Sequence, residues 1–436
     1  MQNPLWMDMI DAANHMIADL RLSSRNNQKT EDVLSSHQKN LFFCGLKNWG
    51  LTQIRVKRLC KKLPPHSSMA ILSIAFGMIN QKRYSEFTIV DQSVEAVKKI
   101  QGRKLASLVN FILRDTLKNL IDAACDKQNP IAKWNAPLWW QEKIKKQFDS
   151  ESFDILRTNK FHPPLTLRVA FSHKNKNEIK LEVETEQSKV LDLGFCALGV
   201  IPPYDVTKTR MFKDGIISIQ DLNSQKVVEF ITPKKNSCLL DACAAPGGKT
   251  FAIASKFPFL NIISSDISGK RLEKLKKDLI RQKKYLLSQP KIIRADLCGI
   301  DSKKKLFSMS NNGFDYIVLD APCTGSGIVR RHPEIPWNKS PQELKKLSIL
   351  QSKMLKSAWC LLKRNGILLY SVCSIFSEEG VEQIRKFCSE NKNVEVLKEL
   401  LFKPTANNKK YGSNEIDNDF LGADGFFYGV LKKIED

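Results

Sequence analysis

The spacing of apolar residues predicts two kinds of structure along this chain of 436 residues. In roughly the first 125 residues, apolar side chains recur every three or four positions, as at Ile10, Ala13 and Ile17. This is the period of an amphipathic helix, and residues 88–97 and 105–114 continue it. Alternation typical of strands is nearly absent there. We therefore expect the N-terminal part of the chain to be an all-α bundle.

The pattern changes beyond this bundle. Residues 129–150 hold prolines and tryptophans and have the composition of a linker. Over 151–232, short alternating segments at 165–169 and 180–183 predict strands of a small α+β subdomain. From residue 233 onward, apolar runs that suit buried strands alternate with helical patterns. This alternation predicts a doubly wound α/β domain with a largely parallel sheet.

Acidic residues close several of the predicted strands of this last domain, at Asp241, Asp266, Asp296 and Asp320. Ligands of open α/β sheets bind beyond the carboxyl ends of the strands. An acid after the second strand suits the hydroxyls of a ribose, and an acid after the third suits an adenine amino group or an ammonium. Together these acids favour a cationic adenosyl ligand.

The first of these strands leads into a Gly-rich turn and then a helix. A phosphate-binding P-loop needs a glycine six residues before its lysine, and Cys243 occupies that position before Lys249. The G-x-G-x-x-G pattern of dinucleotide sites is also absent. The turn therefore suits neither a triphosphate nor a dinucleotide. It consists of Cys243, Ala244, Ala245, Pro246, Gly247, Gly248 and Lys249.

Two cysteines follow neighbouring strands of the same domain. Cys323 comes shortly after Asp320, and Cys373 comes directly after the next apolar run. Neighbouring strand ends would bring the two thiols to one pocket, where an activated thiolate is a strong nucleophile. Attack of a thiolate on carbon 6 of a pyrimidine makes carbon 5 nucleophilic enough to take an electrophilic methyl group. A second polar group beside the nucleophile would then assist release of the product.

The charge of the chain favours a polyanionic partner. Lysine and arginine number 69 against 46 aspartates and glutamates, a formal net charge of +23. Nucleic acid is the expected partner of such an excess, with biased lysine usage as the alternative explanation. An anionic membrane surface fits less well, because no basic helix with a clear aromatic face stands out.

The eleven cysteines are scattered, without a C-x-x-C pair, so neither disulfides nor a metal site is expected. No apolar run approaches the length needed to span a bilayer, and the N-terminus does not resemble a secretory signal. We expect a cytoplasmic monomer that binds no membrane and no metal.

Three strings in combination resemble the RsmB/Fmu (Sun) family of RNA cytosine-5 methyltransferases, within the wider Nop/Sun group. They are DACAAPGGKT at 241–250, DAPCTGSG at 320–327 and YSVCS at 370–374. TIVDQSVEAVK at 88–98, followed by LVNFILR, is similar to the NusB-like helical domain of the RsmB branch. HPPLTLRV at 162–169 resembles the start of its middle subdomain. In this family's pattern a threonine usually stands where this chain has Val372.

The resemblance implies a multidomain protein. It implies a NusB-like RNA-binding domain over 1–128, a linker over 129–150 and an α+β middle subdomain over 151–232. A Rossmann-like class I methyltransferase domain that uses S-adenosylmethionine would span 233–436.

The resemblance also implies roles for individual residues. The turn from Cys243 to Lys249 would hold S-adenosylmethionine, with Asp266 on the ribose and Asp296 on the adenine side. Asp320 would lie between cofactor and base. Cys373 would be the nucleophile and Cys323 would help product release. A basic stretch after the catalytic loop would contact RNA: Arg330, Arg331 and His332.

The expected reaction is therefore transfer of a methyl group from S-adenosylmethionine to carbon 5 of an RNA cytosine, through a covalent Cys373 adduct at carbon 6. The NusB-like pattern favours 16S rRNA, with tRNA as the alternative substrate. A non-catalytic RNA-binding or assembly factor is the alternative of a different class. Such a factor would be expected to have lost a thiol or a cofactor acid, and this chain retains Cys323, Cys373 and Asp266.

Overall fold

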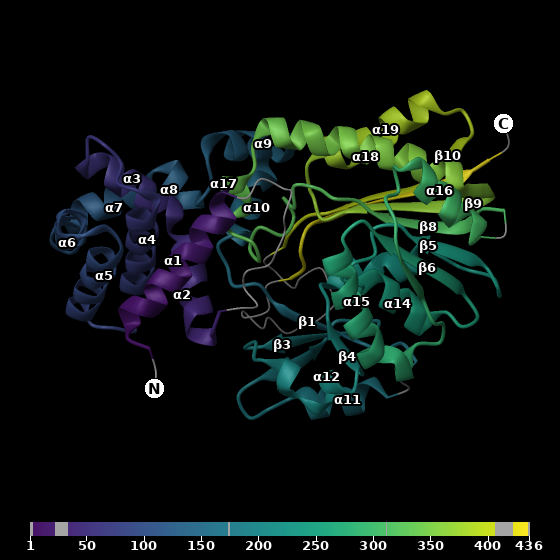
Figure 1. Ribbon diagram of the computed structural model, residues 1–436, viewed down its shortest axis with the longest axis horizontal. Helices are drawn as coiled ribbons and strands as arrows, with labels where there is room; N and C mark the ends of the chain where they lie inside the picture. Colours follow the sequence, from purple (N-terminus) through teal and green to yellow (C-terminus); the bar gives the residue numbers. More distant parts are fainter. Residues whose placement is uncertain (1–2, 22–33, 173–174, 311, 406–421, 435–436) are drawn as a thin grey trace. The chain divides into compact units, whose positions relative to one another are not determined.

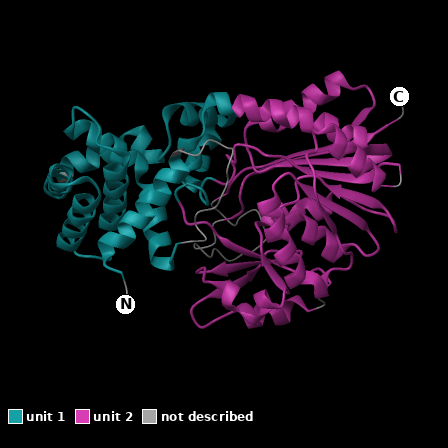
Figure 2. Cartoon of the chain, viewed as in Figure 1, with its two compact units in different colours: residues 1–160, 329–343 teal, residues 161–328, 344–436 magenta. Residues whose placement is uncertain are grey.

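The chain folds into two compact units. The computed structural model describes residues 3–21, 34–172, 175–310, 312–405 and 422–434 (Figure 1). Unit 1 comprises residues 1–160 together with 329–343, and unit 2 comprises residues 161–328 and 344–436 (Figure 2). The chain therefore leaves unit 1, builds most of unit 2, and returns to unit 1 for one short segment. No helix in the described ranges has both the length and the apolar character to cross a membrane.

Unit 1 is all-α, which confirms the prediction for the N-terminal part of the chain. Helix α4 is its centre, because every residue from Ser68 to Met78 is buried, as expected of a helix surrounded by others. The helices are α1 (Leu5–Arg21), α2 (Ser36–Lys47), α3 (Trp49–Leu59), α4 (His66–Gln81), α5 (Glu86–Gln101), α6 (Arg103–Lys118), α7 (Leu120–Gln128), α8 (Pro130–Trp134), α9 (Leu138–Phe148), α10 (Ser152–Thr158) and α17 (Ile335–Asn338).

The short helix α17 belongs to unit 1 although it lies far along the chain. Trp337 packs against the hydrophobic core to which α1 to α6 all contribute. The Asn338 side-chain amide donates a hydrogen bond to the backbone carbonyl of Asp19 in α1, at 3.2 Å. Residues that follow the Cys323 loop thus complete the core of the N-terminal unit.

Unit 2 begins with a small antiparallel sheet, within the region 151–232. Its strands run in the order β2-β3-β1-β4. They are β1 (Leu165–Val169), β2 (Lys189–Asp192), β3 (Ala197–Ile201) and β4 (Ile217–Ile219), with α11 (Lys176–Val183), α12 (Arg210–Lys213) and α13 (Leu222–Gln225) beside or after them.

One predicted strand in this region is wrong. Residues 180–183 form the end of helix α11, whose first turn is capped by the Asn175 side chain accepting from the backbone N–H of Glu178. Ile179 and Val183 are its buried residues, four positions apart on one helical face. Over only four residues, alternation does not distinguish a strand from part of a helix.

The larger sheet of unit 2 has seven strands in the order β10-β11-β9-β8-β5-β6-β7. The five strands from β9 to β7 are mutually parallel, whereas β11 pairs antiparallel with both β9 and β10. The strands are β5 (Cys238–Asp241), β6 (Asn261–Asp266), β7 (Lys291–Arg294), β8 (Phe314–Asp320), β9 (Leu362–Val372), β10 (Val394–Phe402) and β11 (Phe426–Lys433).

Helices connect these strands and complete the doubly wound fold that the sequence predicts. They are α14 (Gly248–Lys256), α15 (Gly269–Gln282), α16 (Ile300–Ser308), α18 (Pro341–Leu361) and α19 (Val381–Glu390). The strand order reverses beside β5, where the chain moves outward first through β6 and β7 and then through β8 and β9. Crevices for ligands form at such a switch point, beyond the carboxyl ends of the strands.

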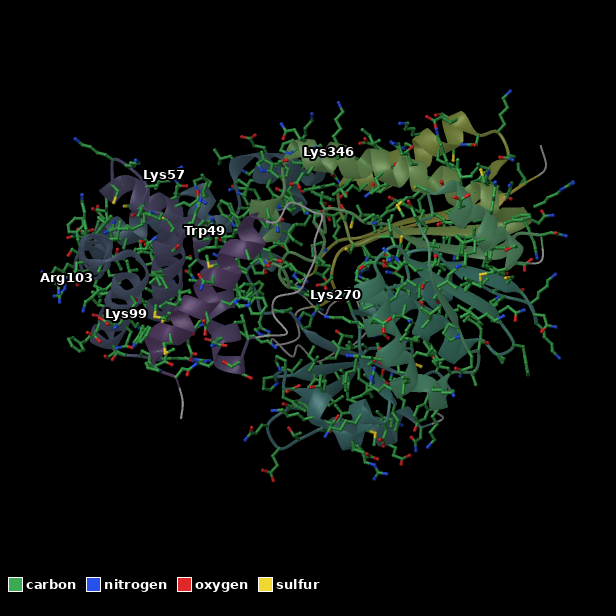
Figure 3. All side chains as sticks on the ribbon, in the orientation of Figure 1. Trp49, Lys57, Lys99, Arg103, Lys270 and Lys346 are labelled. Atoms are coloured by element: carbon green, nitrogen blue, oxygen red, sulfur yellow. The ribbon has the colours of Figure 1, made fainter. Side chains whose placement is uncertain are left out.

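Helix α15 joins the two sheets of unit 2. The Arg281 guanidinium donates to the backbone carbonyls of Phe212, at 2.7 Å, and Ile217, at 3.0 Å. Arg168 in β1 is buried and donates to the Gln282 side chain at 2.8 Å. Part of the basic character of α15 is therefore structural, whereas Lys270 at its start is exposed (Figure 3).

Candidate active site

The turn after β5 is built around a buried carboxyl group. Asp241 ends the strand, and its Oδ2 accepts a hydrogen bond from Thr250 Oγ1 at 2.5 Å. Burial raises the pKa of Asp241 from 3.8 to about 7. Among the residues that the structure describes, none bonds to its Oδ1. Gly247 has φ +113°, and a Cβ there would lie 2.5 Å from the Phe251 ring, so this turn requires glycine at that position.

Asp266, at the end of β6, holds this turn against the sheet. Its side chain is only 2% exposed. One carboxylate oxygen accepts from the backbone N–H of Ser268 at 2.9 Å, and the other accepts from the backbone N–H of Ala245 at 3.3 Å. The Arg271 guanidinium lies 3.2 Å from the second oxygen. Asp296, in the loop after β7, is exposed and accepts from the backbone N–H of Cys298 at 2.9 Å.

Lys249 connects the turn to the end of β8. Its Nζ lies 2.7 Å from Asp320 Oδ2, and the lysine is buried. The other carboxylate oxygen of Asp320 accepts from Ser371 Oγ at 2.9 Å. The ends of β5, β8 and β9 thus converge on one carboxylate. The sequence places Lys249 in the turn but does not reveal this ion pair, because it joins residues that are far apart in the chain.

The two cysteines that follow neighbouring strands lie together. Strands β8 and β9 pair in parallel with Asp320 opposite Ser371, and Ala321 N–H donates to the Ser371 carbonyl at 2.9 Å. Just beyond this pair, Cys323 Sγ and Cys373 Sγ lie 3.4 Å apart, and both side chains are partly exposed. The contact with Cys373, together with burial, raises the pKa of Cys323 well above its ordinary value.

A close backbone contact fixes the loop that carries Cys323. Gly327 N–H donates to the Cys373 carbonyl at 3.0 Å, and Gly425 N–H donates to the Gly327 carbonyl at 2.8 Å. A Cβ on Gly327 would lie 2.1 Å from the carbonyl oxygen of Gly425. The loop after β8 is therefore held between the end of β9 and the residues that lead into β11.

Sequence analysis missed a buried polar cluster behind the two thiols. It consists of Thr324, Ser326, Gln351, Ser374 and Glu379, all buried. The signal available in the sequence is that Thr324 and Ser374 each follow a predicted catalytic cysteine. Glu379 lies outside the strand-end motifs, and so its contact with both loops is a tertiary feature.

The predicted RNA-contacting stretch belongs to unit 1, whereas the residues of the site described above belong to unit 2. Arg330 is 1% exposed, and Arg331 and His332 are partly exposed. The Nδ1 atom of His332 lies 3.1 Å from a carboxylate oxygen of Glu334.

The residues at the ends of β5 and β6 fit an adenosyl group with a positive charge. The Asp266 carboxylate has acceptor capacity beyond the contacts described above, since a carboxylate offers about four lone-pair sites. Asp241 supplies a buried oxygen that has no partner in the described part of the chain. The Gly-rich turn allows a ligand to approach its backbone closely. These acceptor oxygens suit ribose hydroxyls and a cation better than they suit phosphate.

Comparison with known proteins identifies the family. The model of the family "16S rRNA methyltransferase RsmB/F" matches residues 228–432. Ribosomal RNA small subunit methyltransferase B of Pasteurella multocida is 31% identical over 376 residues, which cover 84% of this chain and 80% of the relative. This chain belongs to the RsmB/F family. Membership confirms the resemblance seen in the sequence, and with it S-adenosylmethionine as the methyl donor for methylation of ribosomal RNA.

Solved structures agree with this membership at the level of the fold. The crystal structure of PH0851 has a TM-score of 0.74 at 23% identity and covers 99% of this chain and 100% of that chain. NSun6 from Pyrococcus horikoshii, solved with SFG, has a TM-score of 0.56 at 19% identity and covers 69% of this chain and 99% of that chain. The class I methyltransferase fold of this RsmB/F member is thereby confirmed. The NusB-like character of its helical unit stays a prediction.

Proposed function

We propose that this RsmB/F member methylates carbon 5 of a cytosine in 16S rRNA, with Cys373 as the nucleophile. The observation that carries the proposal is the pair of thiols 3.4 Å apart at the ends of β8 and β9, beside the Asp320–Lys249 ion pair. A single nucleophile would suffice to activate the ring. A second thiol in contact with the first is placed to assist the release of a covalent adduct.

The reaction can be written for the residues of this chain. The Cys373 thiolate bonds to carbon 6, and the electron pair of the carbon 5–carbon 6 double bond moves onto carbon 5 and, through the carbon 4–nitrogen 3 double bond, onto ring nitrogen 3. Bound S-adenosylmethionine supplies the electrophilic methyl group that carbon 5 takes. The proton on carbon 5 then leaves to solvent, the double bond re-forms, and the sulfur of Cys373 departs as a thiolate.

The raised pKa of Cys323 suits a role in this last step, because a thiol that keeps its proton can donate a hydrogen bond. Its partner at 3.4 Å would be the departing sulfur of Cys373. Asp320 would face the base, fixed by Lys249 and Ser371. Its remaining acceptor capacity suits the exocyclic amino group that distinguishes cytosine from uracil.

The turn from Cys243 to Lys249 would hold the methyl donor, with Asp266 on the ribose hydroxyls and Asp296 on the adenine side. Arg331 and His332 would contact the RNA, and the buried Arg330 would have to move to reach it. Exposed cations on three helices of unit 1 would add to this footprint: Lys57 on α3, Lys99 on α5 and Arg103 on α6 (Figure 3). The target base must leave its stack to reach the thiols, so single-stranded loops of the rRNA are the least costly substrates.

Two cysteine variants test the roles of the thiols. Cys373→Ala should abolish methylation and form no covalent complex with RNA. Cys323→Ala should allow attack but slow release, so that protein trapped on RNA accumulates. The measurement is a denaturing gel with labelled rRNA, mass spectrometry of the cross-linked peptide, and bisulfite sequencing of the product. Cys360→Ala removes an exposed thiol on α18 and is the matched control.

Trapping in Cys373→Ala but not in Cys323→Ala would reverse the two roles. Full turnover in both variants would show that the thiols serve only in packing. Methylation of RNA without a bisulfite-resistant cytosine would place the methyl group on another atom and refute the proposed reaction.

A further inference from the structure

Glu379 is a fully buried carboxylate behind the two thiols, at the end of the short 3-10 helix η6 (Ser377–Glu379). One of its oxygens accepts from the backbone N–H of Thr324 at 2.8 Å and from Gln351 Nε2 at 3.1 Å. The other oxygen accepts from Thr324 Oγ1 at 2.5 Å and from Ser374 Oγ at 2.6 Å. A single side chain therefore receives four hydrogen bonds.

The partners of Glu379 stand next to the two cysteines in the chain. Thr324 directly follows Cys323, and Ser374 directly follows Cys373. The carboxylate therefore joins the loop after β8 to the loop after β9 at the positions adjoining both thiols. We propose that Glu379 is a positioning residue that sets the separation of Cys323 and Cys373. The value of this separation for catalysis rests on the proposed function.

The donors around Glu379 require a carboxylate. One oxygen faces two N–H donors, and the other faces two hydroxyls. A glutamine of the same size would present an NH₂ group to one of these pairs, so it could not accept from all of the donors at once. Burial raises the pKa of Glu379, and hydrogen bonds to the carboxylate oppose that rise. The network thus offsets the cost of burying the group.

Glu379 is itself held from two further elements. Tyr370, on β9, donates from its hydroxyl to the backbone carbonyl of Glu379 at 2.7 Å. Gln351, on α18, also donates to the carbonyl of Pro322 at 2.9 Å, one residue before Cys323. These contacts fix the position of the Glu379 carboxylate between the loops after β8 and β9. A support of this kind limits the motion of the reacting groups. Its loss therefore lowers the rate of the reaction.

The separation of the thiols can be measured without RNA or methyl donor. Dibromobimane becomes fluorescent only after both of its arms have alkylated thiols, and mass spectrometry of a digest identifies the bridged pair. We expect the full-length protein to give a Cys323–Cys373 bridge that either cysteine-to-alanine variant lacks. Glu379→Gln should lower the rate of this bridging by ~10-fold, since loosened loops hold the thiols together for less time.

The matched control is Glu378→Gln, which removes the neighbouring charge and should bridge at the unaltered rate. The Glu378 carboxylate accepts from Ser377 Oγ at 3.3 Å, and the four hydrogen bonds that join the two loops are made to Glu379. Folding of each variant is checked by circular dichroism and thermal midpoint. Methylation by Glu379→Gln should slow by roughly 100-fold. Its affinity for S-adenosylmethionine in calorimetry should be unchanged, because Asp266 is untouched.

An unaltered bridging rate in folded Glu379→Gln would overturn the proposal, and so would an absent bridge in the unmodified protein. If Glu379→Gln does not fold, Thr324→Val removes a single hydroxyl donor and should still slow bridging by ~3-fold or more. No slowing in that variant would equally overturn the proposal. Normal bridging in an unmodified protein that methylates no cytosine would refute the proposed function while leaving the positioning role intact.

Discussion

Asp266 is the single side chain on which the predicted cofactor site depends most directly. Its buried carboxylate is held by backbone N–H groups of Ser268 and Ala245, so its oxygens have a fixed direction. Asp266→Ala should weaken binding of S-adenosylmethionine by about 1.5–3 kcal/mol, the range for hydrogen bonds to a charged group. Isothermal titration calorimetry measures the change. Glu273→Ala, an exposed acid on α15, should bind as the unmodified protein does.

Asp241 makes the stability of the protein depend on pH in a defined direction. Its folded-state pKa of about 7 lies above the ordinary value of 3.8, so the folded state holds a proton that the unfolded state has released. The contribution of this proton to the free energy of unfolding is complete below about pH 4. It is lost as the pH rises to about 7, by up to roughly 1.4 kcal/mol per pH unit.

Asp241→Asn, which cannot lose this proton, should therefore unfold at a midpoint that varies less between pH 5 and pH 8. Urea unfolding at a series of pH values gives the comparison. Parallel curves for the two proteins would show that Asp241 is already ionised in the folded protein at low pH.

At the scale of elements, the loop after β8 depends on a glycine that leaves no room for a side chain. A Cβ on Gly327 would meet the backbone of Gly425 at 2.1 Å, and neither backbone can move without breaking the hydrogen bond between them. Gly327→Ala should cost about 1–3 kcal/mol of stability and displace the Cys323 loop. Thermal unfolding and a methylation assay measure the two effects.

Gly269→Ala provides the comparison for this variant. A Cβ on Gly269 meets nothing within 4 Å, and the residue begins α15, where alanine favours the helix. This variant should be as stable as the unmodified protein or more so. Equal destabilisation by both substitutions would mean that crowding at Gly327 is not the cause.

The parts of the site that sequence analysis could predict are those at the ends of parallel strands. Asp266, Asp320 and the two cysteines each follow an apolar run, and parallel strands bring their carboxyl ends to one edge of the sheet. Lys249–Asp320 and the contacts of Glu379 depend on side-chain directions that no local pattern encodes. Helix α11 was missed because four residues of alternation fit either type of element.

At the scale of the whole molecule, the net charge of +23 predicts how binding of rRNA responds to salt. Each phosphate that a lysine or arginine neutralises releases counterions, so affinity falls with rising salt. For about six phosphate contacts, affinity should drop by roughly 10³-fold between 50 and 200 mM salt. Fluorescence anisotropy with a labelled rRNA fragment measures this slope. A flat response would show that the basic excess is not used for RNA.

The return of the chain to unit 1 has a consequence for the order in which the protein is made. Translation releases residues 1–160 first, but Trp337 and Asn338, which pack on and bond to this helical unit, follow only after residues 161–328. Domains generally fold as they leave the ribosome, from the N-terminus onward. The earliest helices therefore lack, at first, a packing segment that follows the Cys323 loop in the chain. A nascent chain halted before residue 335 exposes apolar surface on the helical core that Trp337 covers in the finished molecule.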